Sequence, residues 1–116
     1  MTYEEREKIF KEIWEFFKRT WDTKGVDYSG EIDVLSNFKR SAEKYNITPS
    51  QVIGVLMDKH NQAIETYVKT NQVKGEPIEN KILDNMHYLG LWLCLLKEDE
   101  QRLERQRNKF FEREQT

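Results

Sequence analysis

The chain has 116 residues, with 21 acidic and 19 basic side chains and a formal net charge of −2. This length is near the commonest domain size and predicts one domain with a core of its own. A net charge so close to zero excludes attraction to DNA by bulk charge, so we expect no direct DNA binding. The single cysteine, Cys94, excludes an internal disulfide framework and a thiolate-rich zinc site.

The apolar segments are all short. No apolar stretch of the kind found in secretory signals follows Met1. The longest apolar run, residues 88–96, is too short to span a bilayer. We therefore expect a cytoplasmic protein that makes no membrane contact.

The first predicted helix covers about residues 2–23, where apolar and aromatic residues repeat at helical spacing. This stripe comprises Ile9, Phe10, Ile13, Phe16, Phe17 and Trp21. Residues 24–30 have turn residues at both ends and predict a loop. A second, shorter helix is expected at about residues 33–45.

The third predicted helix covers residues 49–70. Thr48, Pro49 and Gln51 form a helix-start pattern, with a hydroxyl at the N-cap, proline at the first helical position and glutamine three residues after the cap. Gly54 in this helix and Gly90 in the next predict close crossings between helices. The side expected to be buried is marked by Val52, Leu56, Ala63 and Tyr67, with Ile53, Met57, Ile64 and Val68 beside them.

The fourth predicted helix begins near Pro77 and has two distinct faces. One face is apolar and comprises Ile82, Met86, Leu89, Leu93 and Leu96. The opposite face carries Asn80, Asp84, His87 and Tyr88 together with Leu91 and Leu95. Since residues 89–96 are apolar all round, this helix is expected to be central in the core.

The tail, residues 97–116, is highly charged, and an apolar residue recurs every seven positions at Leu89, Leu96, Leu103 and Phe110. One interpretation is a solvated helix end. The other is a projecting helix, about 50 Å long if helical from residue 77 to 110, which favours a homo-oligomer formed through it. The predicted fold is thus all-α: a compact bundle of about four helices over residues 1–96, with residues 97–116 as a charged helical extension of the same domain.

Two polar residues in apolar surroundings, His60 and Asp84, mark a candidate site. His60 lies on the apolar face of its helix, where a histidine is most often a core residue. Asp84 lies mid-helix between apolar residues, where an unpaired buried carboxylate is costly. Its candidate partners are Lys59, His60, Lys81 and Tyr88. Two hypotheses stay open: Asp84 fixes the helix packing through a bond to Lys59 or Arg40, or it belongs to a ligand-facing polar patch.

Several short blocks together resemble a known family. The blocks are Asp27-Tyr28, residues 36–42 (SNFKRSA), residues 59–64 (KHNQAI), residues 76–79 (EPIE), residues 82–84 (ILD) and Tyr88. Their order and spacing, over about residues 23–98, resemble the phage nucleotide-modification-associated domain 1 type family. The resemblance implies an all-α fold, a role near the phage nucleotide pool, and a distant relation to MazG-like nucleotide pyrophosphatases that hold Mg²⁺ on facing carboxylates.

Carried over by position, the resemblance implies a site formed by Asp27, Tyr28, Asn37, Lys59, His60, Glu79, Asp84 and Tyr88. The chain departs from the family pattern at Asn80 and Lys81, and it lacks the combination of an ExxE with an ExxD carboxylate motif that a working pyrophosphatase carries. Hydrolysis with Mg²⁺ and binding without turnover therefore both stay open.

The first functional hypothesis is a protein that binds or hydrolyses a nucleotide triphosphate in a pocket between helices. Lys59 and Arg40 would neutralise phosphate, Tyr28 or Phe38 would stack on the base, and Asp84 would orient a neighbouring group. If the protein is an enzyme, the expected activity is that of a Mg²⁺-dependent nucleotide pyrophosphohydrolase acting in the cytoplasm of the host cell. The alternatives are a non-catalytic oligomeric sponge for a nucleotide immune signal and a protein inhibitor of a host enzyme.

Overall fold

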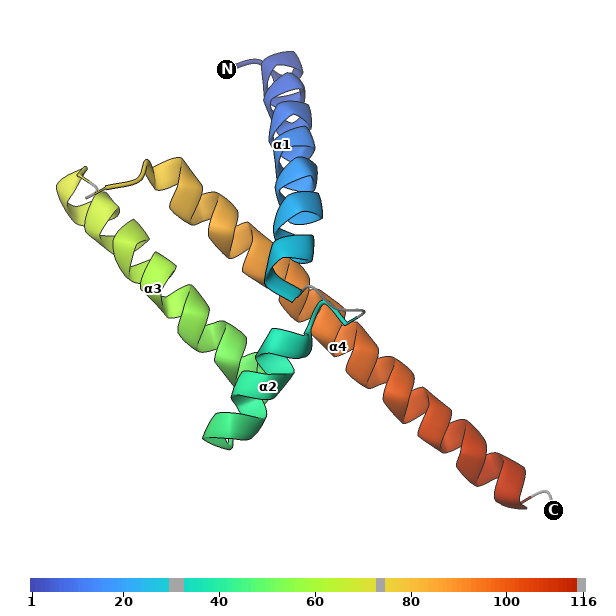
Figure 1. The fold of residues 1–116 in the computed structure, drawn as a ribbon. Helices are drawn as coiled ribbons and strands as arrows, with labels where there is room; N and C mark the ends of the chain where they lie inside the picture. The colour runs from blue at the N-terminus through green and yellow to red at the C-terminus, as the bar shows by residue number, and fades with distance from the viewer. Residues whose placement is uncertain (30–32, 73–74, 115–116) are drawn as a thin grey trace.

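The computed structural model describes residues 1–29, 33–72 and 75–114, with the side chains of residues 23–29 and of Glu114 outside that description. In this part of the chain the fold is all-α, and its helices are α1 (Tyr3–Ser29), α2 (Ser36–Tyr45), α3 (Pro49–Thr70) and α4 (Ile78–Glu114). α3 and the first half of α4 lie side by side and run in opposite directions (Figure 1). α2 lies against one end of α3, and α1 meets α4 near its middle (Figure 1). The predicted four-helix fold with a long C-terminal helix is confirmed.

The arrangement is more extended than the compact bundle expected from the sequence. The radius of gyration is 18.7 Å and the molecule measures 64 × 39 × 28 Å, whereas a compact domain of this length has a radius of about 13 Å. The cause is visible in Figure 1, where the N-terminal half of α1 and the C-terminal half of α4 project away from the other helices.

Most helix ends agree with the sequence, and the start of α2 and the end of α1 differ. The predicted capping box is present: Gln51 N donates to Thr48 Oγ1 at 3.1 Å, and Thr48 N donates to Gln51 Oε1 at 2.8 Å. α2 begins at Ser36 rather than near residue 33, because Asp33 Oδ1 accepts a hydrogen bond from Leu35 N at 2.9 Å and holds a turn there. α1 continues to Ser29, through most of the predicted loop 24–30, since a glycine inside a helix costs only about 1 kcal/mol.

The core lies where α2, α3 and α4 meet. Leu35, Ile53 and Leu95 are buried at its centre. The side chains that pack around this centre are Phe38, Met57, Tyr88 and Leu91. Leu56, expected on the buried side of α3, and Val68, expected beside it, are exposed, and it is Ile53 and Met57 that α3 packs into the core.

The face of α4 that packs against the core is the polar one of the two predicted faces. Tyr88, Leu91 and Leu95 from that face contact the core, whereas the apolar face from Ile82 to Leu96 is exposed. Cys94 is exposed as well. The expectation that residues 89–96 are central in a core is therefore met on one side of the helix only.

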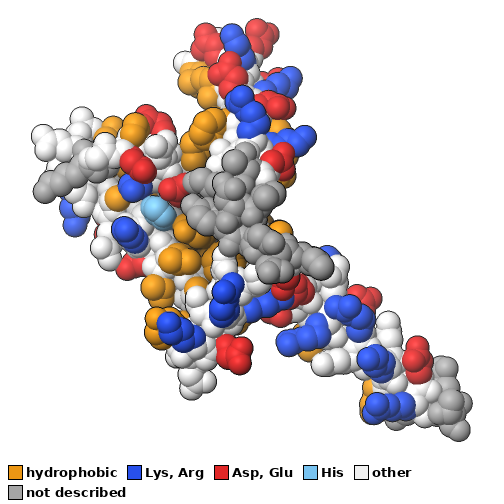
Figure 2. Space-filling model, viewed as in Figure 1, with side chains coloured by type: hydrophobic (Ala, Val, Ile, Leu, Met, Phe, Trp, Pro, Cys, Tyr) orange, Lys and Arg blue, Asp and Glu red, His pale blue; other side chains and the backbone are white. Residues whose placement is uncertain are grey.

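Aromatic side chains cluster along α1, and one of them, Phe17, contacts α4. Trp14 and Phe17 each contact Trp21 edge-on, with ring centroids 5.4 and 5.3 Å away, and Phe17 contacts His87 of α4 at 6.0 Å. Toward its N-terminus the same helix has exposed apolar side chains, Tyr3 and Phe10 among them. Figure 2 shows hydrophobic side chains at the surface of α1 and around α2 and α3.

Gly54 and Gly90 do not mark close helix crossings, so that expectation is wrong. A Cβ added at either residue would meet no described atom within 4 Å outside its own helical turn. Among the described residues, none of the helices is both long enough and apolar enough to cross a membrane.

We expect Ile53→Ala to destabilise the fold by about 2–5 kcal/mol, because it leaves a cavity at a fully buried position in a small core. Val55→Ala, two residues along the same helix at a side chain 67% exposed, is the matched control and should change stability by less than about 0.5 kcal/mol. Urea denaturation followed by far-ultraviolet circular dichroism measures both, and equal effects would contradict the assigned core.

We expect Gly54→Ala and Gly90→Ala each to stabilise the protein by about 0.5–1 kcal/mol, since alanine restricts the unfolded chain and has room in both helices. The same denaturation measurement tests this. Destabilisation by either alanine would mean that another helix approaches closely at that position.

Candidate functional site

Polar side chains from α3 and α4 meet beside the core and form what we call the α3–α4 polar cluster: His60, Asn61, Asp84, Asn85 and Tyr88. His60 Nε2 lies 3.9 Å from Asp84 Oδ2, a distance that suits an ion pair with a protonated ring but is too long for a hydrogen bond. The rings of His60 and Tyr88 stack with centroids 5.7 Å apart. His60 and Asp84, expected partners in the sequence, are therefore neighbours.

One amide of the cluster is buried more deeply than its carboxylate, whereas Asn61 is exposed. Asn85 is buried, and its Nδ2 donates to Asn61 Oδ1 at 2.7 Å. Two buried atoms, His60 Nδ1 and Asn85 Oδ1, have no hydrogen-bond partner among the described residues. The Asp84 side chain keeps 28% of its surface exposed. The cluster thus combines an accessible carboxylate with buried polar atoms that retain hydrogen-bonding capacity.

The other predicted site residues are spread over the fold. Lys59 and Glu79 are exposed. On α2, Arg40 Nη2 donates to Asn37 Oδ1 at 2.7 Å. Phe38 packs against the core, which is the commoner role of such a residue. The predicted ligand-binding residues Asp27 and Tyr28 have side chains outside the described residues.

The structure also places two further residues of the predicted polar patch. Asn80 is exposed near the start of α4. His87 contacts Phe17 and so takes part in holding α1. Asp84 and Tyr88 of that patch contact His60.

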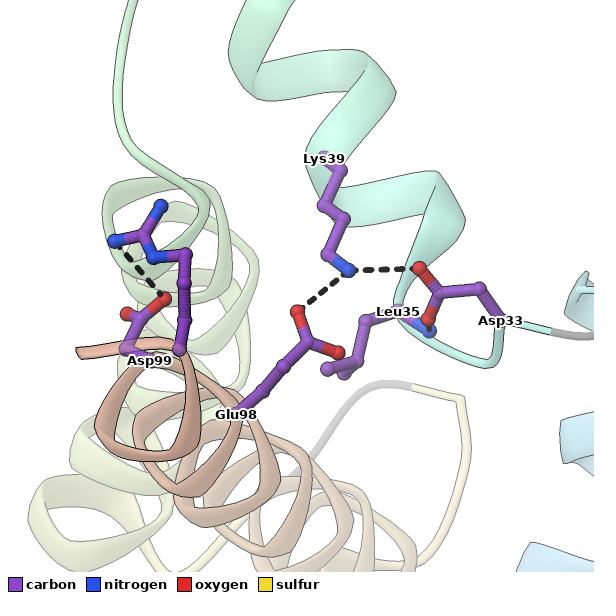
Figure 3. A network of polar contacts seen from close by, with 6 residues as sticks. Asp33, Leu35, Lys39, Glu98 and Asp99 are labelled. Carbon is purple, nitrogen blue, oxygen red and sulfur yellow. Dashed lines mark hydrogen bonds and ion pairs between the residues drawn. The ribbon is translucent and has the colours of Figure 1, made fainter. Parts of the chain in front are cut away.

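A second polar group links α2 to α4 and contains none of the predicted site residues. Lys39 Nζ lies 2.7 Å from Asp33 Oδ2 and 2.6 Å from Glu98 Oε1, so one ammonium group bridges two carboxylates (Figure 3). The hydrogen bond from Lys39 lowers the pKa of Asp33, and the hydrogen bonds to Asp33 and Glu98 raise the pKa of Lys39. Because these side chains are partly exposed, the network is a structural tie of modest strength.

The described side chains give little support for a metal-binding site. Among the described residues, no three His, Cys, Asp or Glu side chains come close enough together to hold a metal ion. In particular, Glu79 lies five positions before Asp84 on α4, which is not the spacing of one helix face. These residues do not fit the paired-carboxylate magnesium site that the family resemblance implies.

Two shallow hollows lie on the projecting helices rather than at the cluster. One is lined by Leu103, Gln106, Arg107, Phe110 and Phe111 near the end of α4. The other is lined by Tyr3, Arg6, Glu7, Phe10, Lys11, Trp14 and Glu15 near the start of α1. Each is an open groove along one helix, so neither corresponds to the predicted pocket between helices.

Asn61, Asn85 and the Lys39 network were not singled out in the sequence. Asn61 directly follows His60, and Asn85 directly follows Asp84. Consecutive residues of an α-helix lie 100° apart around its axis. Their adjacency to the two candidates was a usable signal. The pairing of Lys39 with Glu98, far away in the chain, had no local signal.

The comparisons with known proteins add no relative. No family model matches the chain, and neither a curated protein nor a solved structure matches it. The resemblance to the phage family therefore stays a prediction.

We expect Lys39→Gln to destabilise the protein by about 1 kcal/mol or less at neutral pH, because Asp33 and Glu98 then face each other without a cation. Lys11→Gln, which removes an exposed single pair with Glu7 on α1, is the control and should have a smaller effect.

The wild-type network also predicts a pH dependence. Since the folded-state pKa of Asp33 is lowered, its contribution is complete above the ordinary aspartate pKa of about 3.9 and disappears as the pH falls through the lowered value. Denaturation at a series of acidic pH values should show a shallower loss of stability for Lys39→Gln than for wild type. Parallel profiles would contradict the assignment.

Proposed function

We propose that the protein binds a nucleotide at the α3–α4 polar cluster. The observation that carries the proposal is the convergence of His60 from α3 with Asp84 and Tyr88 from α4, three residues that the family resemblance assigns to one site. Their meeting supports a shared role. It does not identify the nucleotide.

The chemistry of the cluster suits the parts of a nucleotide. A carboxylate such as that of Asp84 accepts hydrogen bonds from ribose hydroxyls or from the N–H groups of a base. The stacked rings of His60 and Tyr88 offer aromatic surface of the kind on which bases stack. Lys59 precedes His60 on α3, and its exposed ammonium group is a suitable counter-charge for phosphate.

The buried polar atoms of the cluster also favour a polar ligand. An unpaired buried donor or acceptor costs about 1–3 kcal/mol. His60 Nδ1 and Asn85 Oδ1 are two such atoms within the described part of the chain. Because both atoms are inaccessible in this structure, a ligand recovers part of this cost only when its binding reorganises the cluster and gives them hydrogen-bond partners.

Of the two forms of the nucleotide hypothesis, the side chains favour binding without turnover. Hydrolysis of the MazG-like type needs several carboxylates around Mg²⁺. The described residues bring no such group together, and Asp84 is the cluster's single carboxylate. We therefore propose a nucleotide-binding protein, with sequestration of a nucleotide as the role that such binding would serve.

Asp84→Asn tests the proposal, because it removes the acceptor charge while keeping the size of the side chain. In isothermal titration calorimetry against a panel of ribo- and deoxyribonucleoside triphosphates and cyclic nucleotides, we expect at least one to bind wild type, and Asp84→Asn to weaken its binding at least tenfold.

Asp58→Asn is the matched control: the same chemical change on α3, at an exposed carboxylate that accepts a hydrogen bond from Gln62. It should leave the affinity unchanged. No binding to any member of the panel would refute the proposal. Equal weakening of nucleotide binding by both variants would show that the site does not lie at the cluster. Recovery of the intact ligand after titration distinguishes binding from turnover.

A further inference from the structure

The exposed face of α4 carries a regular repeat. From Ile82 to Phe110, the positions on this face are separated alternately by four and three residues. This is the spacing of the a and d positions of a coiled coil. We call this row the α4 seam: Ile82, Met86, Leu89, Leu93, Leu96, Glu100, Leu103, Arg107 and Phe110. At 1.5 Å per residue the seam is about 42 Å long. Apolar residues fill it except at Glu100 and Arg107.

The seam is exposed over its whole length. Its apolar members are between 38% and 68% exposed, with Met86 the least and Leu93 the most. The reason is that α3 packs on the other side of α4, against Tyr88, Leu91 and Leu95. An apolar stripe of this length on a water-exposed helix, interrupted at Glu100 and Arg107, marks an interaction surface.

The exposed surface of the molecule is large enough to need a partner. The chain has 9789 Å² of accessible surface, whereas a folded monomer of 14.1 kDa is expected to have about 6,700 Å². The excess is roughly 3,000 Å², and a standard stable interface takes about 800 Å² from each partner. One interface along the α4 seam would fall well within this excess.

We infer that the α4 seam pairs with the α4 seam of a second copy of this chain, and that the two helices run antiparallel. An a/d repeat is self-complementary: its side chains fill the spaces between those of a like helix, so a second copy fits it without any further feature. The inference does not rest on nucleotide binding, because the seam and the α3–α4 polar cluster lie on different sides of α4.

Glu100 and Arg107 determine the orientation. In a parallel pair in register, each would face the same residue of the other chain, which places two carboxylates and then two guanidinium groups opposite each other in the interface. In an antiparallel pair, both face other residues, and their alkyl stems can pack against apolar side chains with the charges at the edge. The antiparallel arrangement therefore avoids two repulsive layers.

Leu93→Glu tests the pairing, because Leu93 is 68% exposed and its replacement should leave the single chain folded. We expect wild type to sediment as a dimer at micromolar concentration and Leu93→Glu to raise the dissociation constant at least tenfold. Val68→Glu, at a side chain of α3 that is 77% exposed and lies off the seam, is the matched control and should not change it. Circular dichroism checks that each variant is folded, and Leu103→Glu replaces Leu93→Glu if that variant is not.

A monomeric wild-type chain would overturn the inference and would assign the seam to a different protein. Equal effects of Leu93→Glu and Val68→Glu would overturn it as well.

Disulfide formation tests the orientation. In a Cys94→Ser background, Leu89→Cys and Leu103→Cys are each oxidised separately. Parallel chains in register would cross-link at both positions, whereas antiparallel chains can cross-link at one of them at most, because only one point of the seam faces itself. Efficient cross-linking at both positions would contradict the antiparallel arrangement.

Discussion

The choice of which face of α4 packs against α3 is the constraint on which the other features of this structure depend. Residues 89–96 are apolar nearly all round, so the apolar pattern alone does not decide this choice. α3 packs on the side of Tyr88, Leu91 and Leu95. As a result, Asp84 and Asn85 lie beside His60 and Asn61, and the row from Ile82 to Leu96 is left at the surface. The candidate site and the candidate interface thus both result from the packing of α3 on this one face of α4.

The sequence was sufficient for the features that depend on neighbouring residues. The capping box at Thr48, the extent of α3 and the long α4 follow from local propensity and capping, and the structure confirms them. The burial pattern was less predictable, because a helix with apolar residues on two faces satisfies helical periodicity whichever face is buried. For the same reason Leu93, expected on an inward-facing stripe, is exposed.

The candidate site was predictable in part. His60 and Asp84 stood out because each is a polar residue in apolar surroundings, and they are indeed neighbours. Asn37 and Glu79 came from position within a resemblance and Arg40 from its charge; the structure pairs Arg40 with Asn37 on α2 and leaves Glu79 exposed. The bridge from Lys39 to Glu98 depends on how α2 meets α4, so it became visible only once the helices were placed. It is the kind of long-range polar contact that periodicity does not reveal.

The position of α1 has a consequence for synthesis of the chain. Its aromatic side chains, Trp14, Phe17 and Trp21, emerge from the ribosome long before His87, the α4 residue that Phe17 contacts. At 5–20 residues per second, the intervening 70 positions take roughly 4–14 seconds to translate. During this interval the nascent helix has no α4 to dock on, and its indole and phenyl rings are open to molecular chaperones. α3 waits less long for its partner, because Ile53 and the α4 residue Leu95 with which it packs are 42 positions apart, or roughly 2–8 seconds at the same rate.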